Sequence, residues 1–236
     1  MSKQNVLIRI LNRLFKPFYL RLIPITQFQL EVERLVRSNR KIKFVQVGAN
    51  DGVRFDDLYF TVTSMGWSGI VIEPMTEMFK RLVLNYSDHP NVTPLNVALH
   101  PTKTEAVIFH VANEKLHRYP DWVAGIASMR RKHLEDNHVN QNDIVAEIVP
   151  CLPLMKIVED YRLEEADLLQ IDTEGFDAEI IRMIDFRHFR PKIIKYEHGN
   201  LDRDDEIAIA GLLSRNGYTV HVDGPMDTVA LLRKHG

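Results

Sequence analysis

The chain has 236 residues, of which 45% are hydrophobic, so it is long enough and apolar enough for one large globular domain. Its formal net charge of -2 and pI near 6.6 give no overall attraction to nucleic acid, and no nucleic-acid partner is expected. The single cysteine, Cys151, excludes an intrachain disulfide framework and a cysteine-rich zinc site. These features are typical of an enzyme or binding module from a reducing compartment.

Residues 1–40 are predicted to form an amphipathic, basic helical extension, because eight basic residues stand there against two acidic ones. Apolar residues recur at helical spacing between Val6 and Phe18, whereas Arg9, Arg13 and Lys16 fall on another face. Such a helix can pack on its own domain, pair with a second subunit, or lie on an anionic membrane surface. The segment is too interrupted for a membrane span and has no signal-peptide pattern. A cytoplasmic location is expected, with peripheral contact at the inner membrane face as the open alternative.

From residue 41 onward, short apolar runs alternate with helical patterns. Strands are expected at KFVQV, GIVIEP, VTPLNVAL, ADLLQID and PKIIKYE, and helices at approximately residues 54–66, 75–87, 154–162, 175–184 and 203–216. This alternation predicts an α/β domain over residues 41–236, with a largely parallel sheet and helices on both faces. The runs GYTVHVDG and DTVALL predict an antiparallel hairpin at the end.

The region from about residue 100 to 155 departs from this alternation. It offers two strand-like runs, EAVIFHVA and DIVAEIVP, without a helical pattern suited to a parallel crossover. We therefore expect an inserted antiparallel pair with a long polar loop between its strands. Long loops within compact domains are usually functional or disordered.

Polar residues follow the expected strands where each one ends. In open parallel sheets, ligands bind at the carboxyl ends of the strands. The residues at this edge are Asn50, Asp51, Glu73, Asn96, Asp172, Glu174, Glu197 and His198. So many polar groups at one edge predict a binding site.

The first two strand ends favour a nucleoside ligand. In the turn VGANDG, Gly48 and Gly52 allow the backbone to approach a ligand closely. Glu73, about twenty residues beyond the first strand, is placed to bind ribose hydroxyls. Asn96, Val97 and Ala98 could frame an adenine or simply form a turn. Neither GxGxxG nor GxxxxGK[ST] is present, which argues against nicotinamide and nucleoside-triphosphate enzymes.

The motifs VQVGANDG, IEP, LNVAL, LLQIDTEGFDAEIIR and IIKYEH together resemble the FkbM family of S-adenosylmethionine-dependent methyltransferases over residues 42–232. The resemblance implies a seven-stranded, Rossmann-like, mostly parallel sheet that ends in an antiparallel hairpin. It also implies S-adenosylmethionine as methyl donor and transfer to an oxygen of a sugar, glycan or other secondary metabolite.

The resemblance also assigns donor contacts within this sequence. The methionine part of the donor would lie along Gly48 to Gly52, near Asn50 and Asp51, and the ribose would lie on Glu73. The adenine would lie beside Asn96, Val97 and Ala98, and the sulfonium close to Asp172. The family's turn often has a neutral residue in place of Asp51, so no particular role for Asp51 follows from the likeness.

Candidates for catalysis and acceptor binding come from the last two strand ends and the insertion. His198 is a candidate base because an unperturbed histidine titrates near neutral pH, with His100 and His133 as further candidates. Alternatively, Asp172 and Glu197 could hold Mg²⁺, bind the donor's amine or orient each other. The insertion is predicted to be an acceptor lid, in which the basic run from Arg130 to Lys132 could meet a phosphate or carboxylate, or stay solvated. The predicted substrate contacts are Tyr119, Trp122, Ser128, Arg130 and Glu174.

Two alternatives to a methyltransferase remain at this point. One is a nucleotide-dependent oxidoreductase of similar fold, and the other is a non-catalytic module that binds the donor or recruits a partner in glycan assembly.

Overall fold

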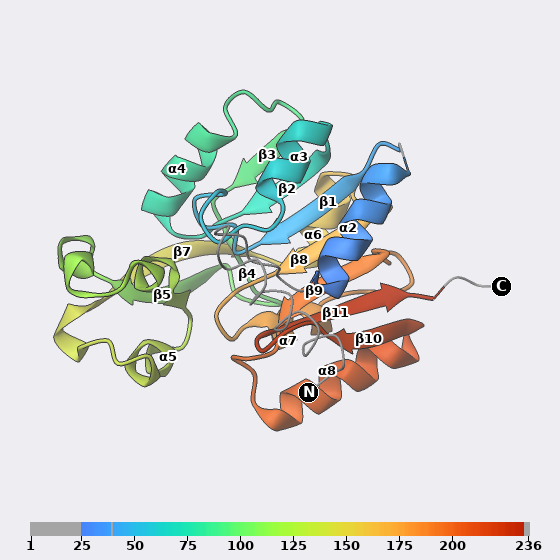
Figure 1. The fold of residues 1–236 in the computed structure, drawn as a ribbon. Helices are drawn as coiled ribbons and strands as arrows, with labels where there is room; N and C mark the ends of the chain where they lie inside the picture. Colours follow the sequence, from blue (N-terminus) through green and yellow to red (C-terminus); the bar gives the residue numbers. More distant parts are fainter. Residues whose placement is uncertain (1–24, 39, 234–236) are drawn as a thin grey trace, which may run out of the picture.

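The computed structural model describes residues 25–38 and 40–233, and its centre is a seven-stranded sheet with the order β10-β11-β9-β8-β1-β2-β3 (Figure 1). Five strands run parallel: β1 (Lys43–Val47), β2 (Ser68–Ile72), β3 (Val92–Leu95), β8 (Leu168–Ile171) and β9 (Ile193–Glu197). The terminal hairpin of β10 (Tyr218–Val222) and β11 (Asp227–Leu232) joins β9 antiparallel. The predicted Rossmann-like sheet with an antiparallel end is confirmed.

Alternating side chains of these strands build two cores, one on each face of the sheet. On one face, Val45 and Ile171 pack with helices α6 (Leu154–Asp160), α7 (Asp177–Arg182) and α8 (Arg203–Arg215). On the other face, Phe44 and Leu168 pack with α2 (Gln27–Arg37), α3 (Tyr59–Met65) and α4 (Thr76–Asn85) (Figure 1). Helices therefore cover both faces and leave the carboxyl ends of the strands for a site.

Helix α3 begins at Tyr59, five residues later than the sequence pattern predicts. The reason is a turn fixed by side-chain hydrogen bonds: Asp56 Oδ1 accepts from the backbone N–H groups of Leu58 (2.6 Å) and Tyr59 (3.3 Å). The helix ends at Gly66, as predicted, in the left-handed conformation that favours glycine. Residues 53–58 thus form an ordered loop between β1 and α3.

Helix α2 packs on the main sheet, and its start is fixed by the other end of the chain. The Asp223 carboxylate, in the β10–β11 turn, accepts from the N–H groups of Gln27 (2.6 Å) and Phe28 (2.9 Å). The Phe28 ring is buried, with the Lys195 ammonium 5.0 Å from its centroid. The helix predicted around residues 6–18 lies outside the described residues. Among residues 25–38 and 40–233, no helix is both long and apolar enough to cross a membrane.

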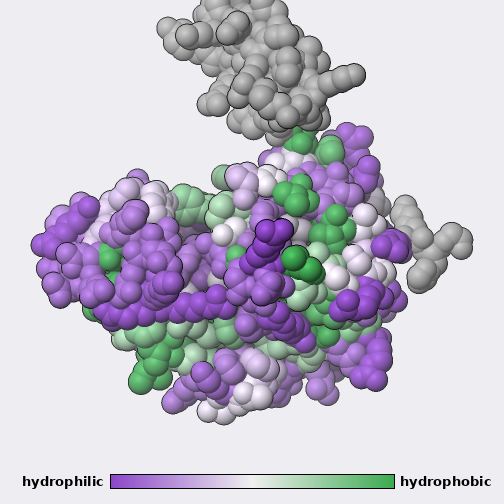
Figure 2. All heavy atoms as spheres, turned by 90° about the horizontal axis from the view of Figure 1, so that it is seen from below, coloured by the Kyte–Doolittle hydropathy of each residue, from purple (hydrophilic) through white to green (hydrophobic). Residues whose placement is uncertain are grey.

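The predicted antiparallel pair of the insertion is confirmed as β5 (Glu105–Val111) and β7 (Ile144–Leu152). Two short strands complete a second sheet of order β4-β7-β5-β6: β4 (Ala98–Leu99) pairs with β7, and β6 (Ala127–Ser128) with β5. The run VTPLNVAL, expected as one strand, is therefore divided between the two sheets. Residues 98–152 are called the inserted lobe below. Figure 2 shows this lobe on the left, with a largely hydrophilic surface on that face.

The long loop of the inserted lobe folds onto the lobe's own core. It contains η2 (Asn113–Arg118), η3 (Asp121–Gly125), α5 (Arg131–Asp136) and η4 (Gln141–Asp143). Val123 and Leu134, from two of these helices, are buried against Val111 and Ile144. Because the loop has this core, it holds the residues that face the main sheet in defined positions.

Candidate active site

A cavity of about 660 Å³ lies between the carboxyl ends of the main-sheet strands and the inserted lobe. The structure brings many of the predicted site residues together in its wall. Those that line the cavity are Gly48, Asn50, Glu73, Val97, Ala98, Trp122, Asp172, Glu174 and Glu197. The volume lies within the range typical of small-molecule sites.

Gly48 brings the ends of β1 and β8 into contact. Its φ of 77° is left-handed, and a Cβ there would lie 1.7 Å from the carbonyl oxygen of Asp172. Its N–H donates to the carbonyl oxygen of Ile72 at 3.0 Å. Only glycine can adopt the left-handed φ and also leave out the Cβ that would clash. The turn after β1 can therefore lie directly against the end of β8.

Glu73 is held in place by the backbone at the end of β2. Its Oε2 accepts from Asn50 N–H at 2.8 Å and its Oε1 from Met75 N–H at 2.9 Å. The residue is 6% exposed, and burial raises the pKa of its carboxyl to about 7. Apolar Met75, Val97 and Ala98 line the same part of the wall. A carboxylate beside an apolar surface suits the ribose and the base of a nucleoside.

Asp51 and Gly52 do not line the cavity, although the sequence predicts donor contacts for both. Asp51 Oδ1 accepts from Val53 N–H (3.0 Å) and Arg54 N–H (2.8 Å), and so shapes the loop from within. A Cβ on Gly52 would lie 2.6 Å from Leu82 Cδ1, which faces the core. Both residues therefore support the turn from behind, and their direct contact with the donor stays a prediction.

Asn96 also lies outside the cavity wall. Its Nδ2 donates to the carbonyl oxygens of Glu73 and Pro74, both at 2.9 Å. The amide thus fixes the turn that carries Glu73. Val97 and Ala98 line the cavity and Asn96 does not, and the adenine contacts of all three stay predictions.

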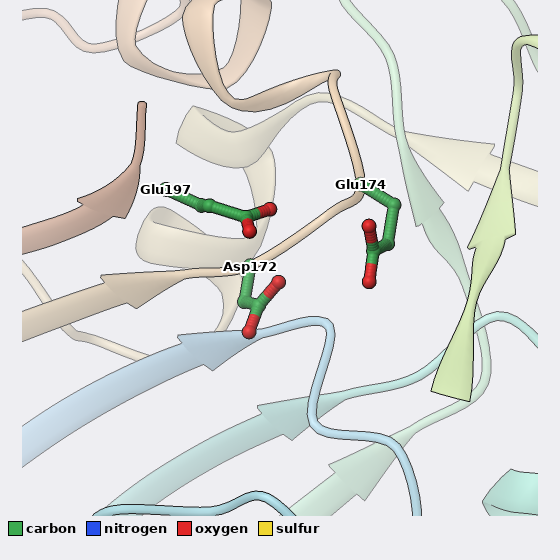
Figure 3. Close-up of side chains that lie close together, drawn as sticks. All are labelled: Asp172, Glu174 and Glu197. Carbon is green, nitrogen blue, oxygen red and sulfur yellow. The ribbon is translucent and has the colours of Figure 1, made fainter. Parts of the chain in front are cut away.

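Three carboxylates meet at the ends of β8 and β9. Asp172, Glu174 and Glu197 point toward one another, with one oxygen of each within 4.8 Å of the others (Figure 3). Asp172 is exposed to the cavity, and partial loss of solvent there, followed by the charges of Asp177 and Glu174, raises the pKa of Asp172 to about 8. Enclosure and the charge of Asp172 raise the pKa of Glu197 to about 9. The cluster therefore favours binding a proton or a cation near neutral pH.

Asp177 holds these strand ends together and was not predicted as a site residue. It is fully buried at the start of α7. Its Oδ2 accepts from Thr173 Oγ1 (2.7 Å), and its Oδ1 accepts from Glu197 N–H (3.1 Å). Burial raises its pKa to about 6. Its place in the motif IDTEGFDAEII was the available sequence signal.

Glu174 connects the carboxylate cluster to the inserted lobe. It has a left-handed φ of 53°, and its Oε2 lies 2.9 Å from both His133 Nε2 and Asn200 Nδ2. Ser128 Oγ donates to its carbonyl oxygen at 2.8 Å. The predicted substrate residue Ser128 and candidate base His133 lie outside the cavity wall, where they hold the lobe against the sheet.

The other two histidine candidates also lie outside the cavity wall. His198 follows Glu197 in sequence, and its Nδ1 lies 3.0 Å from Thr228 Oγ1. His100 Nδ1 accepts from two backbone N–H groups, and its ring stacks on Phe176. The carboxylates line the cavity and His198 does not, so its role as catalytic base stays a prediction.

The predicted lid residues divide into two groups. Trp122 lines the cavity and is 48% exposed. Tyr119 is tied up inside the lobe, where its OH donates to Asp143 Oδ2 at 2.8 Å. Arg130 lies 3.9 Å from Glu179, outside the cavity wall. Neither Tyr119 nor Arg130 lines the cavity, and their contacts with the acceptor stay predictions.

Several wall residues were missed by the sequence patterns because only the tertiary structure brings them to the site. Phe55 comes from the β1–α3 loop and His110 from β5. Gln46 and Gln170 are paired neighbours on β1 and β8, and each has a buried Oε1 without a hydrogen-bond partner among the described residues. The sequence of a strand does not show whether a glutamine within it faces a cavity.

Comparison with known protein families shows which family contains this chain. The sequence profile of the Methyltransferase FkbM domain matches residues 46–220, which is most of the chain. The chain belongs to the FkbM methyltransferase family. The match includes the turn at Gly48, Glu73 and the carboxylate cluster. A search of curated protein sequences finds no match.

Solved structures similar to this FkbM methyltransferase are distant in sequence. The METTL16 MTase domain is 13% identical, with 94% of this chain and 77% of that chain covered and a TM-score of 0.48. The precorrin-6y C5,15-methyltransferase from Geobacter metallireducens is 14% identical, with 85% and 87% covered and a TM-score of 0.40. A human methyltransferase 10 domain containing protein is 14% identical, with 95% and 94% covered and a TM-score of 0.42. The family assignment rests on the sequence profile.

Membership of the FkbM family implies S-adenosylmethionine as the donor, and the charge of the cavity fits that molecule. Among the charged side chains that line the cavity, most are acidic. Arg54 is the one lysine or arginine in the wall among the described residues. The acidic wall residues are Asp56, Glu73, Glu77, Glu147, Asp172, Glu174, Glu197 and Asp227. A sulfonium and an ammonium group are attracted by such a wall.

Proposed function

We propose that this FkbM methyltransferase transfers the methyl group of S-adenosylmethionine to a hydroxyl oxygen of a sugar, glycan or other hydroxylated metabolite. The observation that carries the proposal is the pair Asp172 and Glu197, with pKa values raised to about 8 and about 9. They line the same cavity as Glu73. Proton acceptors and a nucleoside-binding carboxylate in one cavity are what transfer to a hydroxyl requires.

The donor would be held by the first two strand ends. Glu73 would accept hydrogen bonds from the ribose hydroxyls, and the apolar side chains of Met75 and Val97 would border the adenine. The turn from Gly48 to Asn50 would lie along the methionine portion. When bound, the donor supplies an electrophilic methyl group on a positively charged sulfur. The protein's contribution is to orient an acceptor oxygen in line with that group, and orientation alone can lower a barrier by several kcal/mol.

The acceptor hydroxyl must lose a proton as its oxygen is methylated. Asp172 or Glu197 would take that proton, because a base with a pKa near or above neutral holds a proton better than an ordinary carboxylate does. Glu174 lies beside them and is hydrogen-bonded to His133 and Asn200. The proposal assigns the catalytic base to the carboxylate pair.

A magnesium ion on the same carboxylates is the second possibility for activating the acceptor. Asp172, Glu174 and Glu197 offer hard oxygen ligands within 4.8 Å of one another, which is the observation that favours it. A bound divalent ion would lower the pKa of the acceptor hydroxyl. Methyl transfer measured with EDTA and with added Mg²⁺ separates the two mechanisms. Activity that survives EDTA supports the carboxylate base, and activity restored only by Mg²⁺ supports the metal.

The donor assignment is tested by calorimetric titration with S-adenosylmethionine. We expect micromolar affinity for the native chain and a loss of about 1.5–3 kcal/mol in Glu73→Ala, where a charged hydrogen-bond acceptor is removed. Glu164→Ala, at an exposed position after α6, is the matched control and should bind as the native chain does. A folded native chain that binds no donor would refute the proposed function.

Turnover distinguishes an enzyme from a donor-binding module. The native chain, supplied with labelled S-adenosylmethionine and a panel of hydroxylated acceptors, should release S-adenosylhomocysteine in proportion to methylated product. Donor binding without transfer to any acceptor would instead favour the non-catalytic module.

A further inference from the structure

Phe55 has an unusual backbone conformation at the entrance of the cavity. Its φ is 61°, in the left-handed region that bulky side chains rarely adopt, and its side chain is 67% exposed. Burial of the ring therefore does not stabilise this conformation. Backbone strain of this kind clusters at functional sites, where the surrounding structure maintains it.

The residues on both sides of Phe55 are anchored. Before it, the N–H of Arg54 donates to Asp51 Oδ1 at 2.8 Å. After it, Asp56 Oδ1 accepts from the N–H groups of Leu58 and Tyr59, and Asp57 Oδ2 lies 2.5 Å from the Lys195 ammonium on β9. These contacts fix both neighbours, so the outward position of the ring follows from an ordered loop.

The inserted lobe meets Phe55 from the other side of the entrance. A Cβ built on Gly125 in η3 would lie 3.8 Å from Phe55 Cδ2 and 3.3 Å from Asn50 Nδ2. Trp122 belongs to the same short helix, is half exposed, and lines the same cavity. The donor turn and the lobe thus each contribute an aromatic residue to one entrance. The Arg54 guanidinium lies 5.9 Å from the centroid of the Phe55 ring, on the loop side.

The inner wall restricts the charge of a molecule that enters. Beyond the two aromatic residues lie Asp172, Glu174 and Glu197, all acidic. Arg131, at the start of α5, is instead paired with Glu135 at 3.2 Å. When these carboxylates are ionised, which is the form that can accept a proton from the acceptor, they repel a phosphate or carboxylate group on it.

We propose that Phe55 and Trp122 form an aromatic pair that holds the acceptor, and that the acceptor is an uncharged, hydroxylated ring. The apolar face of such a ring packs on aromatic side chains, while its hydroxyls donate to Asp172 and Glu197. This inference rests on the proposed function, which it narrows from hydroxylated metabolites in general to uncharged rings. Phe55 is then a specificity residue that the motifs of the donor site do not reveal.

The experiment uses the full chain saturated with S-adenosylhomocysteine and titrated with methyl pyranosides. Trp122 serves as the reporter because the other tryptophan, Trp67, is 3% exposed in the core. We expect a change in tryptophan emission that is absent in Trp122→Phe. Phe55→Leu should weaken pyranoside binding about 10-fold, because the flat contact surface is lost. Donor affinity should be unchanged in both variants.

Phe60 provides a matched control, since it is 73% exposed on α3 and does not line the cavity. Phe60→Leu should leave pyranoside binding unchanged. Equal effects of Phe55→Leu and Phe60→Leu would overturn the proposal. So would tighter binding of sugar phosphates than of pyranosides, or the lack of any response at millimolar pyranoside in a protein that binds the donor.

Phe55→Gly separates ligand binding from a structural role. Glycine adopts the left-handed conformation without strain, so the thermal midpoint should stay the same or rise while pyranoside binding falls as in Phe55→Leu. A lower midpoint would overturn the proposal by showing that the ring stabilises the fold. If no variant and no native chain binds the donor, the proposed function itself fails, and this inference fails with it.

Discussion

The acidic side chains at the two ends of the cavity have different surroundings: backbone hydrogen-bond donors at one end and other carboxylates at the other. At the donor end, both oxygens of Glu73 accept backbone hydrogen bonds before any ligand binds. At the other end, Asp172, Glu174 and Glu197 lie together, and loss of solvent followed by repulsion from neighbouring carboxylates raises the pKa values of Asp172 and Glu197. The donor end is thus preorganised, whereas the acceptor end becomes more stable when it gains a proton or positive charge. This contrast indicates that one end of the site is built for binding and the other for reaction.

The contact between the two ends can be broken at Gly48. In Gly48→Ala, the new Cβ would clash with the Asp172 carbonyl oxygen at a left-handed φ, so we expect a loss of about 4 kcal/mol in the free energy of unfolding. Gly66→Ala is the matched control, because it is also left-handed but has nothing within 4 Å of the new Cβ. It should cost about 1 kcal/mol. Chemical denaturation measures both, and equal losses would show that the clash is relieved by movement.

Removing the base should affect turnover and leave donor binding intact. We expect Asp172→Asn to lower kcat about 10²- to 10³-fold, which is typical for loss of a general base. In the native chain, kcat should rise between about pH 7 and 9, because the carboxyl with a pKa of about 8 must lose its proton to act as a base. Asp88→Asn, at an exposed position after α4, is the control. An unchanged pH profile in Asp172→Asn would assign the base elsewhere.

Repulsion between the carboxylates at the acceptor end should also lower the free energy of unfolding. The folded-state pKa of Glu197 is raised from 4.5 to about 9, so the folded chain binds more protons than the unfolded chain between these values. The ionisation of Glu197 therefore lowers the free energy of unfolding progressively as the pH rises through that range. We expect Glu197→Gln to be more stable than the native chain by about 1–2 kcal/mol at pH 8, since water in the cavity screens part of the repulsion. Denaturation near pH 4 should show little difference. A destabilised variant at pH 8 would contradict the repulsion.

The smallest expected effect concerns the hold of the inserted lobe on the sheet. His133→Gln removes the contact with Glu174 Oε2, so we expect a loss of at most about 1 kcal/mol in stability and a several-fold rise in the KM for the acceptor. His117→Gln, on the exposed surface of the same lobe, should change neither. Equal KM values for both variants would show that this contact does not position the lobe.

The donor end could be predicted from the sequence because its determinants are local. Glycine at a strand end and an acidic residue after the next strand have fixed spacings, and Gly48 and Glu73 lie where the pattern places them. The largely parallel sheet with helices on both faces followed in the same way from the alternation of strand and helix. The pattern did not distinguish residues that line the cavity from those that support it, so Asp51 and Asn96 were assigned direct contacts.

The acceptor end was harder to predict because its contacts join segments far apart in sequence. Whether Glu197 or His198 faces the cavity depends on which side of the sheet each one faces, and adjacent residues in a strand face opposite ways. Tyr119 looked like an aromatic contact, yet its hydroxyl is used inside the lobe. Phe55 was overlooked because a left-handed φ at a phenylalanine cannot be read from local pattern.

The cap that Asp223 places on α2 has a consequence for the order of assembly. Thr26 and Gln29 cap the first helix in the described part of the chain locally, and the N–H groups of Gln27 and Phe28 donate to a carboxylate nearly two hundred residues later. During synthesis, α2 must wait for the last hairpin to leave the ribosome before it can be capped in this way. This contact joins the start of α2 to the β10–β11 turn, so it can form only after both segments have been synthesised.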